Sequence, residues 1–201
     1  MNGIRAFFAL ALEGDAKAAA ARELERLRAL PGADAVRFVR GDGLHVTLRF
    51  LGEIPHAQVA PLATAVGAEL APLAPFDATL GAVHAFPSAR RPRVVALELL
   101  PEAPFTALAA AVERGVVATG FAPEPRPFRA HLTLGRVRPG RRLDPSLAAP
   151  AEAPAAAPTS FPVRSIVLYQ STLAPEGSTY TPLERLPLGG DDHPRSTPSK
   201  E

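Results

Sequence analysis

The sequence predicts an α+β fold, and three observations support this prediction. First, 201 residues with 47% hydrophobic and 21% charged side chains have the size and composition of one globular domain, or of two intimately packed lobes. Second, strand-like and helix-like segments are mixed along the chain, which indicates a mixed rather than an all-parallel sheet. Third, the same pattern, His-x-Thr-Leu, occurs once in each half of the chain.

The N-terminal part begins with a strand followed by a helix. Residues 4–12 are apolar and bounded by glycines, as expected of a buried strand. Asp15 has a side chain suited to the N-cap of a helix, and residues 16–30 are strong helix formers. Pro31 and Gly32 are expected to end this helix.

Two more strands are expected over residues 35–39 and 44–51. The glycines of Arg40-Gly41-Asp42-Gly43 can take the positive φ angles that hairpin turns require, so the two strands are expected to be joined by this turn. A second helix is expected over residues 57–70, after Pro55.

The rest of the chain also contains both strand-like and helix-like segments. Further strands are expected over residues 76–86, 94–99, 128–137, 161–171 and 179–186, and a third helix over residues 104–119. The segment 139–158 is rich in alanine and proline, with too few bulky residues to anchor a core, and is expected to be a loop. Residues 1–188 would then form the folded domain, and residues 189–201 a disordered polar tail.

The composition excludes several classes of protein. The chain has no cysteine, and therefore no disulfide, thiolate metal ligand or cysteine nucleophile. No apolar run approaches the ~20 residues of a transmembrane helix. The formal net charge of +2 is far below the electrostatic footprint of a strongly nucleic-acid-binding domain. We therefore expect a cytoplasmic protein that has no membrane partner.

The candidate catalytic residues lie in the repeated pattern. His45-Val-Thr-Leu48 and His131-Leu-Thr-Leu134 both stand in strand-like surroundings. Because successive side chains of a strand alternate between faces, His45 and Thr47 should share one face while their neighbours enter the core. The same holds for His131 and Thr133. Each half of the chain thus offers one imidazole and one hydroxyl on the same face.

The residues around the two patterns resemble the two-histidine phosphoesterase superfamily, in particular the RNA 2',3'-cyclic phosphodiesterases, also named 2'-5' RNA ligases. The likeness extends to Arg5-Ala-Phe-Phe-Ala-Leu10, Thr47-Leu-Arg-Phe-Leu-Gly52, Val167-Leu-Tyr-Gln-Ser171 and Gly177-Ser-Thr-Tyr-Thr-Pro-Leu183, and it covers the chain to about Leu188. It implies a bilobal fold, in which two mixed α/β lobes with antiparallel-rich sheets are related by a pseudo-twofold axis. Both histidine motifs would face a central cleft.

The resemblance also implies roles for individual residues. His45 and His131 would be the catalytic pair. The substrate-binding residues would be Thr47 and Thr133 on phosphate oxygens, Arg136 on the phosphate, and Phe50 against the base or ribose.

Two of these roles require an irregular strand. Phe50 and Arg136 each lie five residues past the histidine of their motif, which in a regular strand is the opposite face. A bulge after Leu48 and after Leu134 would return them to the histidine face, and bulges are common beside active sites.

The function implied is hydrolysis of RNA 2',3'-cyclic phosphate ends to 2'-phosphates by a monomer that uses no metal and no cofactor. Two imidazoles suit this reaction because, with an unperturbed pKa of ~6.5, one can be neutral and the other protonated near neutral pH. By microscopic reversibility the same site could form 2'-5' RNA linkages. Which histidine is the acid stays open.

The remaining histidines and the tyrosines have structural interpretations. A lone histidine on a strand is more often structural than catalytic. His56, at an expected helix start, and His84, near the end of an expected strand, are interpreted as structural or surface residues. Tyr169 and Tyr180 are expected to pack in the core. A nucleotide-binding module without turnover, and a phosphodiesterase acting on a small-molecule cyclic phosphate, are the alternative functions.

Overall fold

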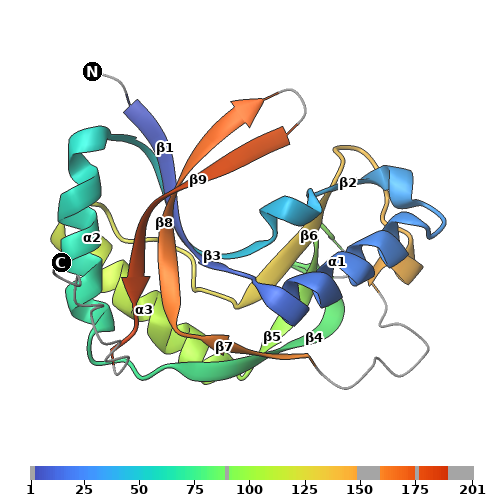
Figure 1. Cartoon of the computed structure of the whole chain (residues 1–201). Coiled ribbons are helices and arrows are strands. Elements are labelled where there is room, and N and C mark those ends of the chain that lie inside the picture. Colours follow the sequence, from blue (N-terminus) through green and yellow to red (C-terminus); the bar gives the residue numbers. More distant parts are fainter. Residues whose placement is uncertain (1–2, 89–90, 149–158, 175–176, 190–201) are drawn as a thin grey trace, which may run out of the picture.

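The computed structural model describes residues 3–88, 91–148, 159–174 and 177–189. Within these residues the chain forms two antiparallel sheets that lie side by side, with helices beside them (Figure 1). The predicted α+β class is confirmed. Of the described helices, none is long and apolar enough to span a membrane.

The first sheet carries the first histidine motif. Its strand order is β3-β1-β8-β9, and every neighbouring pair is antiparallel. Its strands are β1 (Gly3–Ala11), β3 (His45–Pro55), β8 (Ser165–Ala174) and β9 (Gly177–Pro187). Residues 6–10 of β1 are all buried, because this central strand is covered on both faces, which explains its unbroken apolar sequence.

The second sheet carries the second motif. Its strand order is β2-β6-β5-β4-β7, again antiparallel throughout. Its strands are β2 (Val36–Phe38), β4 (Phe76–Phe86), β5 (Val94–Leu100), β6 (His131–Val137) and β7 (Ser160–Val163). Both histidines are the first residues of their strands, β3 and β6, and these two strands contact each other across the sheets.

The described residues form three α-helices, which lie beside the sheets (Figure 1). Helices α2 (Val59–Leu70) and α3 (Glu102–Ala118) pack against each other. Helix α2 contacts β9 of the first sheet, and α3 contacts β3 of the same sheet. Helix α1 (Gly14–Arg28) contacts β7 of the second sheet, although it follows β1 in sequence. Helices α1 and α3 therefore pack against the sheet that does not contain the strand preceding them, whereas α2 follows β3 and stays with the first sheet.

The prediction of Asp15 as the N-cap of the first helix is wrong. The N-cap is Glu13, and Asp15 lies in the first turn. Gly14, with a φ of +54°, turns the chain so that the helix begins earlier than a capping Asp15 would allow. The Asp15 carboxylate still lies near the positive end of the helix dipole.

Two pairing predictions are also wrong. Strands β2 and β3 form no hairpin, because β2 pairs with β6 and β3 with β1. The intervening Gly41–Gly43 form a 3-10 turn, η2. The strand expected over residues 161–171 is in fact two strands, β7 and β8, which belong to different sheets. Pro162 in β7 lacks an N–H group, which suits the edge position that β7 occupies in its sheet.

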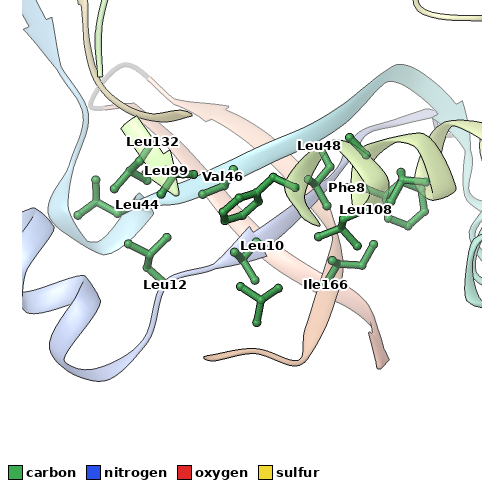
Figure 2. Packing of buried hydrophobic residues seen from close by; sticks show 14 of the residues in the cluster. Phe8, Leu10, Leu12, Leu44, Val46, Leu48, Leu99, Leu108, Leu132 and Ile166 are labelled. Atoms are coloured by element: carbon green, nitrogen blue, oxygen red, sulfur yellow. The ribbon is translucent and has the colours of Figure 1, made fainter. Parts of the chain in front are cut away.

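One hydrophobic core joins the two sheets. Figure 2 shows Phe8 and Leu10 of β1 packed with Val46 of β3, Leu132 of β6 and Leu108 of α3. The apolar residues between the motif histidines and threonines are buried, as strand alternation predicts. Because both sheets contribute side chains to a single core, we expect them to fold as one unit.

Part of the segment expected to be a loop is anchored. Leu147, in the 3-10 turn Pro145–Ala148, is fully buried, and the Asp144 carboxylate accepts hydrogen bonds from the backbone N–H and the hydroxyl of Ser146. Arg141 forms an ion pair with Asp34. The rest of that segment, residues 149–158, and the tail 190–201 lie outside the described residues.

Candidate active site

A cavity of about 380 Å³ lies where the face of the first sheet meets β6. Its wall includes His45, Thr47 and Phe50 from the first motif, together with Thr133 and Arg136 from the second. The fold thus brings together five of the six predicted site residues. Among the described residues that line the cavity, His131 is missing.

One ring nitrogen of His45 is engaged in a hydrogen bond with the backbone. Its Nδ1 lies 2.7 Å from the carbonyl oxygen of Gly43, and since a carbonyl only accepts hydrogen bonds, Nδ1 carries a proton. The imidazole packs on Phe7 at 4.9 Å between ring centroids and meets the ring of Tyr180 edge-on at 4.8 Å. This arrangement leaves Nε2 as the nitrogen that can take up or release a proton.

His131 repeats this arrangement on the second sheet. Its Nδ1 lies 2.8 Å from the carbonyl oxygen of Arg129, again two residues before the histidine. Its ring packs on Phe86 at 5.1 Å between centroids. Thr133, two residues further along β6, lines the cavity, so strand alternation places His131 on the face that turns toward it.

The bulge predicted in the first motif is confirmed. In the β1–β3 pair, Thr47 and Arg49 oppose consecutive residues of β1, and Leu48 is the extra residue. The extra residue shifts the alternation by one position. Phe50 therefore joins the cavity wall, where its side chain is 53% exposed.

The second motif has its bulge at the equivalent position, which confirms that prediction as well. In the β5–β6 pair, Thr133 and Gly135 oppose consecutive residues of β5, and Leu134 is the extra residue. Arg136 thereby lines the cavity. A Cβ on Gly135 would lie 2.5 Å from Cγ1 of Val36, so the close approach of β2 requires glycine at this place.

Arg49 ties the first motif to the segment that leads into the second. Its guanidinium donates a 2.7 Å hydrogen bond to the carbonyl of Ala122. It also pairs with Glu113 of α3 at 2.7 Å and with Glu124 at 3.2 Å. Since residues 119–130 connect α3 to His131, these contacts fix the relative position of the two motif strands.

The cavity suits an anion. Two guanidinium groups, those of Arg5 and Arg136, belong to its wall, and the described lining residues include no aspartate or glutamate. Besides Thr47, the first sheet contributes three further hydroxyl residues to the wall: Ser171, Ser178 and Tyr180. Among the described residues, no three histidine, aspartate or glutamate side chains come together as a metal site.

Sequence reasoning gave no site role to several residues of the wall, among them Tyr180 and Arg5. Tyr180 is expected to be a core residue, yet it contacts the His45 ring and lines the cavity. The family resemblance includes Arg5 but implies no role for it. The available signal was a cation within an otherwise apolar strand, but only the folded structure shows that Arg5 lines the cavity.

Burial lowers the pKa of the His45 imidazole, and the hydrogen bond from Nδ1 to Gly43 opposes this effect only in part. Desolvation disfavours the charged form, so His45 is neutral in the empty cavity at neutral pH. A phosphate anion bound beside the ring would raise the pKa again.

This shift predicts a pH dependence of stability. Above pH ~6.5 His45 is neutral in both the folded and the unfolded chain. As the pH falls below ~6.5 the unfolded chain binds the proton more readily, so the free energy of unfolding should decrease until the pH passes the lowered folded pKa. Urea unfolding at pH 7.5 and 5.0 measures this decrease, which should be smaller in His45→Gln. In the control His56→Gln it should equal that of the wild type, and equal decreases in all three proteins would contradict the prediction.

The comparisons with known proteins agree with this geometry. The family model described as 2'-5' RNA ligase superfamily matches residues 16–174. An RNA 2',3'-cyclic phosphodiesterase of Methanothermobacter thermautotrophicus is 31% identical over 182 residues, which cover 90% of this chain and 97% of that protein. A protein of the same name from Thermus thermophilus is 33% identical over 195 residues, covering 94% and 92%.

Solved structures are also similar to this chain over nearly its whole length. The crystal structure of E. coli LigT complexed with 3'-AMP has a TM-score of 0.69 and 30% identity, covering 93% of this chain and 99% of that one. The crystal structure of the Thermus thermophilus protein TT0787 has a TM-score of 0.70 and 32% identity, covering 94% and 100%.

Proposed function

This chain belongs to the 2'-5' RNA ligase superfamily, and from that premise we propose that it hydrolyses RNA 2',3'-cyclic phosphate ends to 2'-phosphates with a histidine acid/base pair and without a metal. The observation that carries the proposal is the matched setting of two imidazoles. In both His45 and His131 the Nδ1–H group donates to the carbonyl two residues earlier. Each side chain can therefore exchange a proton only through Nε2.

The reaction requires two proton transfers on opposite sides of phosphorus. One imidazole accepts a proton from the attacking water as the P–O bond to that oxygen forms. The other donates a proton to the 3' oxygen as its bond to phosphorus breaks, and the phosphate stays on the 2' oxygen. A 5'-hydroxyl of a second RNA in place of water would give a 2'-5' linkage, the ligation that the family name describes.

The cavity supplies groups for the charge that develops on phosphorus. Thr47 and Thr133 enter it from the two motif strands, and Arg136 adds a positive charge. Hydroxyl and guanidinium donors directed at the non-bridging oxygens would stabilise the transition state, because such bonds to an anion are stronger than those between neutral groups. Phe50, half-exposed on the same wall, offers an aromatic surface to the base or ribose.

The lowered pKa of His45 affects which of the two histidines is protonated before the reaction. As the base, His45 would act as the neutral imidazole, the form that its burial favours. As the acid, it would have to regain its proton through the bound phosphate, whose negative charge favours imidazolium. His131 would take the complementary role in each case.

The direct test uses a short RNA that ends in a 2',3'-cyclic phosphate, incubated with the protein in excess EDTA. We expect complete conversion to the 2'-phosphate at a rate that the chelator does not change, and a small amount of 2'-5' product when an RNA with a 5'-hydroxyl is added. Chromatography separates the 2'-phosphate from the 3'-phosphate.

Other results would support the alternatives. Tight nucleotide binding with no product after long incubation would indicate a binding module. Turnover confined to a small-molecule cyclic phosphate would indicate a different substrate class, and loss of activity in EDTA would contradict the metal-free mechanism.

A further inference from the structure

We propose that the cavity contains a second anionic subsite, centred on Arg5, that binds the phosphate on the 5' side of the terminal nucleotide. The inference rests on the proposed function, because it places the 2',3'-cyclic phosphate at the histidine end of the same cavity. The ligand is the phosphodiester that joins the terminal nucleotide to the rest of the RNA, or a 5'-phosphate in its place.

The first support is that the Arg5 guanidinium has no hydrogen bond or ion pair with another described residue. Arg5 is exposed and belongs to the cavity wall. Glu53 lies directly opposite Arg5 on β3 and shares its face, but among the described residues the two form no ion pair, and Glu53 does not line the cavity. A cation in a wall whose described residues include no carboxylate is available to an external anion.

The second support is its distance from the site of reaction along β1. Thr47 lies opposite Ala9, and Arg5 is four residues before Ala9 on the same strand. At ~3.3 Å per residue this separation is roughly 13 Å between the two levels of the sheet. The phosphate held beside His45 and Thr47 is therefore at the other end of the cavity from the backbone of Arg5.

The third support is what lies between these two ends. Phe50 is paired with Phe7 of β1, at a level between Thr47 and Arg5, and its ring is half-exposed on the wall. The cavity thus offers, in order, a phosphate site, an aromatic surface and a second cation. A nucleotide has the same order of groups: its terminal phosphate, its nucleoside and its 5'-phosphate.

Serine residues of the wall lie on the strands beside Arg5. Ser171 of β8 lies directly opposite Arg5. Ser178 of β9 also belongs to the wall. A guanidinium with neighbouring hydroxyl donors matches a phosphodiester, which carries one charge and several acceptor oxygens.

The test compares two substrates that differ only in the 5'-phosphate: adenosine 2',3'-cyclic phosphate and its 5'-phosphorylated form. We expect kcat/KM of the wild type to be about tenfold higher for the second, the order of one charge-assisted contact. In Arg5→Gln this ratio should fall to about one. The control Arg114→Gln removes an equal charge from α3, where Arg114 pairs with Glu69, and should keep the wild-type ratio.

Two outcomes would overturn the subsite. The first is a wild-type ratio near one. The second is a ratio near ten that Arg5→Gln leaves unchanged, and an equal loss on both substrates in that variant would place Arg5 at the reacting phosphate instead.

Failure of the proposed function is recognised separately, as no turnover of either substrate. The subsite is then tested by calorimetry with 2'-AMP and adenosine 2',5'-bisphosphate. About tenfold tighter binding of the bisphosphate, lost in Arg5→Gln, would support it. Equal affinities in the wild type would refute it.

Discussion

Alanine in place of either His45 or His131 should lower kcat for the cyclic phosphate substrate by about 10² to 10⁴-fold, the contribution of one general acid or base. In the proposed mechanism the two imidazoles act in one concerted step, so the double variant should be little slower than the slower single variant. Steady-state kinetics on adenosine 2',3'-cyclic phosphate measures both effects. His56→Ala is the matched control, since His56 is exposed on the 3-10 turn after β3, and it should retain full activity.

A sulfur leaving group separates the two roles. If the 3' bridging oxygen of the substrate is replaced by sulfur, the departing thiolate needs no proton, because thiols are far more acidic than alcohols. The variant that lacks the acid should then recover most of its rate, whereas the variant that lacks the base should stay slow. Full activity of either single variant on the oxygen substrate would refute the histidine mechanism.

Gly115→Ala should cause the largest loss of stability among the conservative changes considered, about 1 to 3 kcal/mol. A Cβ at Gly115 of α3 would lie 2.6 Å from Cα and 2.8 Å from the backbone nitrogen of Val66 in α2. Backbone atoms cannot move aside as a flexible side chain can, so the two helices would have to separate. Urea unfolding at neutral pH measures the change.

Gly67→Ala provides the matched control within the helix pair. It is also a helical glycine, in α2, but a Cβ there would meet no atom within 4 Å. Alanine favours the helix over glycine, so this variant should be more stable than the wild type by about 0.5 to 1 kcal/mol. The same sign of change in both variants would contradict the close approach of α2 and α3.

The sequence predicted those parts of the site that depend on a single strand. Alternation along β3 and β6 placed His45 with Thr47 and His131 with Thr133, and the strand burial agrees with it. The five-residue spacing to Phe50 then required a bulge, which the register shows. These predictions succeeded because the direction of a side chain in a strand follows from its own and the neighbouring residues.

Strand pairing was less accessible to sequence reasoning. The glycine-rich turn over residues 40–43 has the composition of a hairpin, yet its flanking strands belong to different sheets. Burial of Val36 beside Gly135 of β6 holds β2 in the second sheet. Local turn propensity was outweighed by packing against a strand about a hundred residues away, as is common for sheets.

By itself the sequence determined which side chains share a face, where the strands must be irregular, and to which family the chain is similar. Only the tertiary structure decided that Arg5 and Tyr180 reach the cavity, that Arg49 joins the two motif segments, and that burial lowers the pKa of His45. The reason is physical: side-chain alternation is a property of one strand, whereas cavities, ion pairs and desolvation arise from residues that are distant along the chain and meet only when it folds.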